Sequence, residues 1–140
     1  MKIKINACES LDNSFLSLLE NYTDKDKMKI MNCIYHIVNN HNWKSIMPYA
    51  KQLSDTNEEE LFEFRVSLSK NLIRINYFID YEDNSVIILN AYEKPNWAKN
   101  NNGYIKANKK SINKKIDCLI QEALKLKKQY FINNEFYYEL

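Results

Sequence analysis

The sequence predicts an α+β fold: an N-terminal strand and a helical hairpin packed on an antiparallel meander sheet, followed by a C-terminal helix. Two observations predict the sheet. Apolar and polar residues alternate between Leu61 and Ile79, and short polar connections divide that part of the chain into strands. A third observation predicts the helices, because apolar residues recur three and four positions apart on both sides of the sheet region. We expect the helices to cover one face of the sheet.

The first residues predict a strand and a short helix. Isoleucine alternates with lysine and asparagine over Lys2–Asn6, which is typical of a half-buried strand and favours a place at a sheet edge. Asp12 is a residue type that caps helices, so we expect a short helix from Asp12 to Tyr22.

A second helix is predicted over Asp24–Asn39, with Thr23 or Asp24 as its cap. Because the connection is short, the two helices should form an antiparallel hairpin. The apolar stripe that we expect to face the sheet is Met28, Met31, Ile34, Tyr35 and Val38.

Three strands should follow a loop or short helix over Trp43–Leu53. We expect them near Leu61–Leu68, Leu72–Ile79 and Val86–Ala91, and the last of these, a continuous apolar run, should be central and buried on both faces. A final helix after Gly103 has an apolar face made of Ile112, Ile116, Leu119, Ile120 and Ala123.

The chain has one glycine and two prolines, so no flexible linker divides it, and we expect a single domain over residues 1–140. Residues 125–140 form a C-terminal extension rich in aromatic residues. That composition is typical of a surface that binds another protein, and it suits core packing equally well.

Composition excludes several classes of protein. The N-terminus lacks the apolar run of a signal peptide, and no segment is long and apolar enough to span a membrane, which favours a cytoplasmic protein. The three cysteines form no CxxC pair, so they predict reduced, buried thiols; we expect no metal and no cofactor. The net charge of +2 does not by itself indicate a nucleic-acid-binding protein. However, Lys94 to Lys115 contains seven lysines and no acidic residue, which predicts a local basic surface.

The two arginines are the most informative residues in a chain that has 18 lysines. In the predicted hairpin Val66 lies opposite Ile73, which places Arg65 directly opposite Arg74. Two cations in such a pair repel, and a sheet tolerates them best when an anion lies between them or when Glu63 offsets their charge. Arginine can bind phosphate through two parallel hydrogen bonds, so the pair of arginines predicts a phosphate site. The alternative is that both are solvated residues on the polar face of the sheet.

The sheet region resembles that of a known family. The segments Leu61–Arg65, Asn71–Tyr77 and Val86–Lys94 are similar to the core of HigB-like toxins, a branch of the RelE/ParE superfamily. That core is an aromatic-Glu-apolar-Arg strand, an Arg-containing strand, and an apolar strand that ends in aromatic-x-Lys. The resemblance extends from Asp12 to Lys110.

This resemblance implies a toxin of a type II toxin–antitoxin pair, which cuts mRNA on the ribosome by metal-independent attack of a 2′-OH on the adjacent phosphate. Its implied partners are the ribosome, mRNA and a cognate helix-turn-helix antitoxin, with a homo-oligomer or a hetero-oligomer with the antitoxin as possible assemblies and no membrane. Arg65 and Arg74 would hold the phosphate, and Lys94 would stabilise charge or assist proton transfer. Tyr92 would stack on a base or position one. The RNA-binding lysines would be Lys106, Lys109 and Lys110.

Two departures from the family pattern leave other functions open. Glu93 precedes Lys94 where the family often has a second lysine, and no histidine follows His41. One alternative is a ParE-like inhibitor of DNA gyrase. Another is a catalytically inactive homologue that acts as a protein-binding module.

Overall fold

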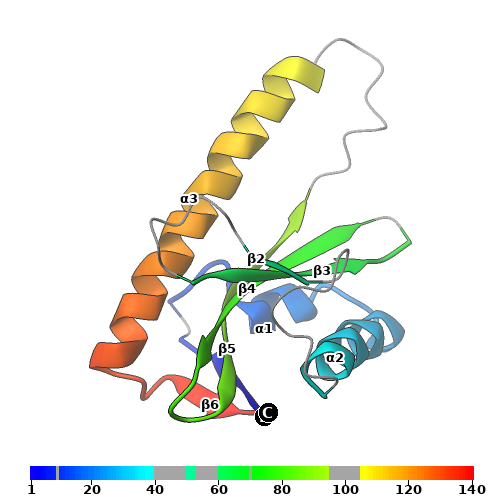
Figure 1. Cartoon of the computed structure of the whole chain (residues 1–140). Helices are drawn as coiled ribbons and strands as arrows, with labels where there is room; N and C mark the ends of the chain where they lie inside the picture. Colours follow the sequence, from blue (N-terminus) through cyan, green and yellow to red (C-terminus); the bar gives the residue numbers. More distant parts are fainter. Residues whose placement is uncertain (9, 40–49, 53–59, 70, 95–104) are drawn as a thin grey trace.

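The computed structural model describes residues 1–8, 10–39, 50–52, 60–69, 71–94 and 105–140, with only the backbone for 50–52 and 105–109. The described residues form a six-stranded sheet in the order β2-β3-β4-β5-β1-β6, with helices on both of its faces (Figure 1). The elements are β1 (Lys2–Asn6), α1 (Phe15–Leu19), α2 (Asp24–Asn39), β2 (Ala50–Gln52), β3 (Phe62–Ser67), β4 (Leu72–Asp80), β5 (Ser85–Lys94), α3 (Ile105–Ile132) and β6 (Tyr137–Glu139). The predicted α+β class is confirmed.

The meander of β3, β4 and β5 is antiparallel throughout, as predicted. Its first turn closes with a hydrogen bond of 2.8 Å from the Leu68 amide to the Asn71 carbonyl. Arg65 therefore lies opposite Arg74, and Val66 lies opposite Ile73. The predicted register of the hairpin is confirmed.

The prediction that the N-terminal strand lies at a sheet edge is wrong. On one side β1 pairs with β5 in parallel, and on the other it pairs with β6, so that Lys4 lies opposite Glu139. The parallel pair also makes the sheet mixed and not purely antiparallel. Neither β2 nor β6 was predicted, and β2 falls where we expected a loop or short helix. Each has three residues, too few to show an alternating pattern.

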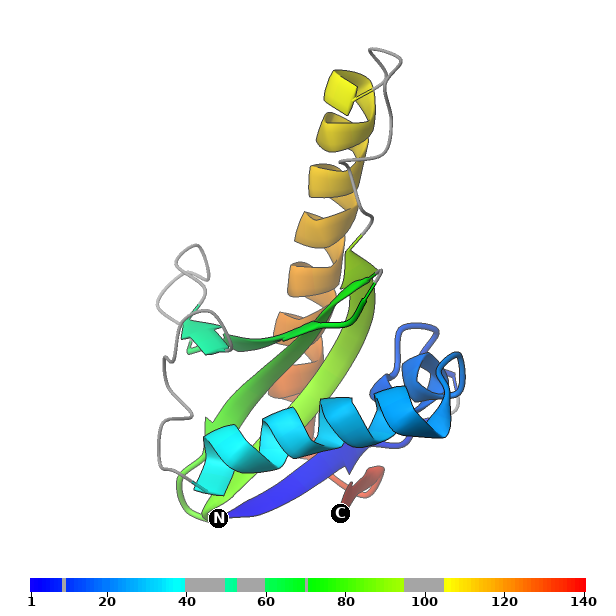
Figure 2. The same cartoon turned by 90° about the vertical axis from the view of Figure 1, so that its right-hand side faces the viewer.

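Helices cover both faces of the sheet, whereas the sequence led us to expect one (Figures 1 and 2). We call the two faces of the sheet the α1/α2 face and the α3 face, after the helices that cover them. Both need a cover because successive residues of the central strands, such as Tyr77 and Phe78 on β4, are large and fully buried on opposite faces. On the α3 face the apolar cluster is small and consists of Leu61, Phe78, Ile87, Leu89, Ala123 and Tyr130.

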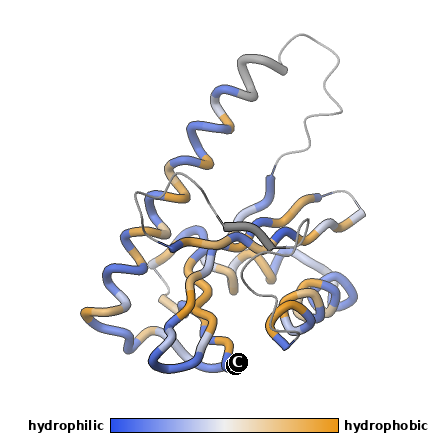
Figure 3. Tube along the Cα trace, viewed as in Figure 1, coloured by the Kyte–Doolittle hydropathy of each residue, from blue (hydrophilic) through white to orange (hydrophobic). Residues whose placement is uncertain are grey.

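The predicted bounds of α2 are confirmed, and its predicted stripe is confirmed for Ile34 and Val38, with Met31 partly buried against the core, but is wrong for Met28 and Tyr35. The buried residues are Ile30, Ile34, Ile37 and Val38. Met28 is 64% exposed and Tyr35 is 39% exposed. The predicted and the buried sets share Ile34 and Val38 and both fit helical spacing, so the pattern alone did not decide which flanking residues face the sheet. Figure 3 shows the apolar side of this helix turned towards the strands.

The N-terminal cap was predicted correctly for α2 but not for α1. Thr23 caps α2 by accepting a hydrogen bond of 3.3 Å from the Asp26 amide, as one of the two expected residues. Asp12 does not cap α1; Ser14 does, by accepting from the Ser17 amide. The reason is that the carbonyl of Asn13 accepts a hydrogen bond from Ala91 on β5, which holds the chain outside the helix up to that point.

A β-bulge in β5 decides which residues face α3. Tyr77 pairs with Ile88, whereas Asn76 pairs with Asn90, so Leu89 is an extra residue. Before the bulge Ile88 belongs to the core of the α1/α2 face. After it Asn90 reaches α3, and Tyr92 follows two residues later on the same side.

Three further features bear on the sequence predictions. In the part of the chain that the structure describes, no helix is long and apolar enough to cross a membrane. The cysteines are free, but Cys118 is exposed and the other two are half-buried, so the expectation of buried thiols is wrong. In the aromatic extension Tyr130 is buried in the α3 cluster, which confirms a role in core packing, whereas Phe131 and Phe136 are exposed.

Candidate functional site

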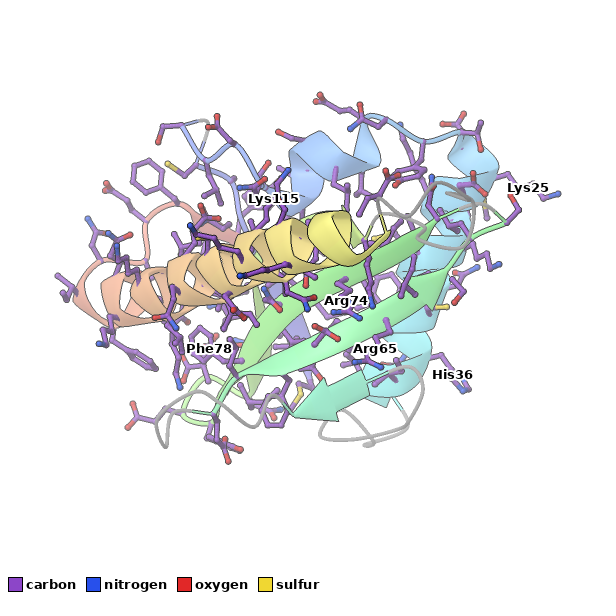
Figure 4. All side chains as sticks on the ribbon, turned by 90° about the horizontal axis from the view of Figure 1, so that it is seen from above. Lys25, His36, Arg65, Arg74, Phe78 and Lys115 are labelled. Atoms are coloured by element: carbon purple, nitrogen blue, oxygen red, sulfur yellow. The ribbon has the colours of Figure 1, made fainter. Side chains whose placement is uncertain are left out.

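Polar side chains form two cross-strand rows on the α3 face, beyond the end of its apolar cluster. The pairing of β3, β4 and β5 aligns each row across all three strands. The buried row is Glu63, Asn76 and Asn90. The arginine row is Arg65, Arg74 and Tyr92. Figure 4 shows the two arginines on neighbouring strands beside α3.

Glu63 holds the two arginines together. Its side chain is only 1% exposed, and its Oε1 accepts a hydrogen bond of 2.7 Å from the Nε of Arg65. The Nε of Arg74 lies 3.8 Å from the same oxygen. Of the two ways in which the sequence allowed the facing cations to be tolerated, the structure shows charge compensation by Glu63.

Two polar atoms of the arginine row are buried without a hydrogen-bond partner among the described residues. They are the Nε of Arg74 and the hydroxyl of Tyr92. A buried donor that lacks an acceptor costs about 1–3 kcal/mol, and the cost is higher for a charged group. Both atoms can donate a hydrogen bond, so the row has donor capacity that its described neighbours leave unused.

Tyr92 is a buried proton donor. Burial raises the pKa of its hydroxyl above the ordinary value near 10; the negative charge of Glu63 raises this pKa further, and Arg74 and Arg65 lower it in part. The hydroxyl therefore keeps its proton at neutral pH. Because the side chain is only 7% exposed, the ring is not the open stacking platform that single-stranded RNA commonly uses.

The buried row fastens α3 to the sheet. Asn76 donates through Nδ2 to the Oδ1 of Asn90 at 2.9 Å. Asn90 in turn donates to the carbonyl of Leu119 at 3.0 Å and to Glu122 at 2.9 Å. Neither asparagine was among the residues predicted to form the site. The signal was present, because asparagine is unfavourable inside a strand unless its side chain has a specific partner.

Residues 18–118 match the family described as "Phage derived protein Gp49-like (DUF891)", a RelE/toxin-like family. The chain belongs to this Gp49-like family. The matched region includes both rows and reaches into α3. No match was found among curated proteins or among solved structures. The family match does not distinguish the HigB-like branch, which stays a prediction.

The remaining predicted residues of this Gp49-like protein lie on β5 and on α3. Lys94 is half-buried two residues after Tyr92, which by strand alternation is the same face of the sheet. Lys110 is exposed on α3. Lys106 and Lys109 also belong to α3, and their side chains are outside the described part of the structure.

Glu93, the departure from the family pattern, is directed away from the arginine row. Its Oε1 accepts a hydrogen bond of 2.9 Å from Asn71 beside the β3–β4 turn. Strand alternation places it on the opposite face of β5 from Tyr92.

Proposed function

We propose that this Gp49-like protein is the toxin of a type II toxin–antitoxin pair, and that it cuts mRNA on the ribosome through metal-independent attack of a 2′-OH on phosphate. The observation that carries the proposal is the arginine row, where two guanidinium groups and a neutral phenol meet around a buried carboxylate. Its site of action would be the cytoplasm, and a helix-turn-helix antitoxin would restrain it.

The row suits a phosphate that gains negative charge during the reaction. Glu63 engages the Nε of Arg65 and leaves the outer N–H groups of that guanidinium for phosphate oxygens. Arg74 adds a second cation from the next strand. Because the strands and Glu63 fix these donors before substrate binds, they can stabilise the transition state without first reorganising.

Two other residues have supporting roles in the proposal. The hydroxyl of Tyr92 would donate a hydrogen bond to a phosphate oxygen. Lys94 would stabilise charge or assist a proton transfer from the end of the same strand. The exposed lysines of α3, including Lys110, would contact RNA backbone, where point charges are sufficient.

The test is cleavage of mRNA on translating ribosomes, with primer extension to map the cut and analysis of the new ends. We expect products with a 2′,3′-cyclic phosphate, because that group forms when the neighbouring 2′-OH is the nucleophile. A single 2′-deoxynucleotide at the cut position should block cleavage. Absence of cleavage together with inhibition of gyrase supercoiling would instead support the ParE-like function. Absence of both together with tight binding to a protein partner would support the inactive binding module.

A further inference from the structure

The second half of β5 borders a pocket that the proposed chemistry does not use. β1 accompanies β5 only as far as Ile88. Beyond that point the loop before α1 lies along β5, and the carbonyl of Asn13 accepts a hydrogen bond of 2.9 Å from the Ala91 amide. A pocket of about 370 Å³ lies where this loop, α1, β5 and α3 meet.

The lining of this pocket has one polar side and one apolar side. The polar side comes from the loop and α1 and includes Asp12 and Asn13. Neither of these side chains makes a hydrogen bond to another described residue, so the edge is available to a ligand. Ile112 and Ile116 of α3 supply the apolar side. A nucleobase has the same division, with flat apolar faces and an edge of donors and acceptors.

The size of the pocket also suits a base. Its volume is near the lower end of the roughly 300–1,000 Å³ that small-molecule sites span. It is therefore large enough for one flat heterocycle and too small for a folded peptide segment.

Tyr92 connects this pocket to the arginine row. Tyr92 lines the pocket, and its buried hydroxyl lies in the field of Arg74 and Glu63. Neighbouring strands are about 4.8 Å apart, so the pocket edge of β5 is within about two strand spacings of the backbone of Arg74. Lys115, which also lines the pocket, lies on the side of α3 towards α1 (Figure 4). Its positive charge stands beside the carboxylates of Asp12 and Glu93 in the same lining.

We propose that this pocket binds the base of an RNA nucleotide whose phosphate occupies the arginine row. The inference rests on the proposed function and deepens it, because it names the part of the substrate that a separate set of residues recognises. Asn13 reads the edge of the base, and Ile112 packs against its face. Cleavage then depends on the presence of a base at one position beside the cut.

The experiment compares short synthetic mRNAs in programmed ribosome complexes, identical except that one nucleotide beside the cut is either intact or abasic. For wild type we expect the rate to fall at one abasic position by no more than the roughly 5- to 150-fold that a base stacked on an aromatic side chain contributes, because here the base packs on Ile112. Ile112→Trp fills the pocket, so it should cut the intact mRNA as slowly as wild type cuts the abasic one. It should also be indifferent to the missing base.

Two further variants control for folding. Asn113→Trp adds the same bulk at an exposed neighbour that does not line the pocket, and it should behave as wild type. Asn13→Ala removes the amide edge but keeps the backbone hydrogen bond to Ala91, and it too should reduce the ratio of the intact to the abasic rate.

The outcomes separate the two proposals. If wild type cuts intact and abasic mRNAs equally at every position, or if Ile112→Trp and Asn13→Ala keep the wild-type ratio, the pocket does not bind a base and only this inference fails. If wild type cuts neither mRNA, the proposed ribonuclease function fails and the inference fails with it.

Discussion

The two faces of the sheet are built from the same strands and have different compositions. On β4 the residues Ile73, Ile75 and Tyr77 point into a large apolar core under α1 and α2. Their neighbours Arg74 and Asn76 belong to the polar rows of the α3 face. The α1/α2 face is apolar on β5 as far as Ala91 and ends in the exposed Glu93, whereas the α3 face changes earlier, from an apolar cluster to buried polar rows.

This difference shows how the fold keeps charged groups in place. The α1/α2 core fixes the backbone of three strands. The strands then hold the two facing arginines close together in spite of their mutual repulsion. The bulge in β5 is essential to this arrangement, because it turns Asn90 and Tyr92 to the α3 face beside Asn76 and Arg74. Substitutions on the two faces should therefore have different consequences.

The largest effect on stability is expected on the α1/α2 face. Ile75→Ala should lower the free energy of unfolding by about 2–5 kcal/mol, because it leaves a cavity at a fully buried position. Denaturant titration measures the loss, and the cleavage rate per folded molecule should be unchanged. A substantial loss of activity in the folded fraction would show that the two faces are not separate in function.

A smaller loss of stability is expected for Glu63→Gln. The substitution keeps the size of the side chain and removes the charge that both arginines share, so it should cost roughly 1.5–3 kcal/mol, the value of a hydrogen bond to a charged group. Unlike Ile75→Ala, it should also slow cleavage by the folded protein, because Arg65 loses its fixed orientation. Unchanged melting and unchanged cleavage would mean that Glu63 does not organise the row.

The smallest effect is a dependence of stability on alkaline pH from the apolar end of the α3 face. Burial raises the pKa of Tyr130, and its hydrogen bond of 2.8 Å to Asp80 raises it further. Because the folded pKa is above the unfolded value of about 10, this contribution to stability is fully present below about pH 10 and is lost as the pH rises further. Tyr130→Phe should make the decline in stability above that pH less steep. An identical decline in both proteins would contradict the assignment.

Much of the fold could be predicted because it depends on local pattern. The register of the β3–β4 hairpin follows from alternation and a tight turn, and the bounds of α2 follow from spacing and capping. The interior place of β1 depends on the three-residue strand β6 from the other end of the chain, which carries no period of its own. Which residues flank Ile34 and Val38 on the buried side of α2 likewise depends on how the helix lies on the sheet, which the spacing alone does not give.

The candidate site, like the fold, could be predicted only in part from the sequence. The arginine pair followed from the hairpin register, and the family resemblance added Tyr92 and Lys94. The buried row and the pocket did not follow, because both need α3 placed on the far face and the bulge that turns Asn90 towards it. A single extra residue in a strand reverses the facing of all residues after it, and alternation alone does not reveal where it occurs.

The central claim is that the arginine row binds the phosphate that reacts, and Arg74 tests it most directly. We predict that Arg74→Ala slows mRNA cleavage on translating ribosomes by roughly a hundred- to thousandfold, by analogy with the loss of one preorganised donor to a developing oxyanion. Arg74→Lys should recover only part of the rate, because an ammonium group lacks the two-pronged geometry. Thermal melts of all three proteins should show that the fold is intact. If Arg74→Ala cuts as fast as the wild-type protein, the arginine row is not the catalytic site.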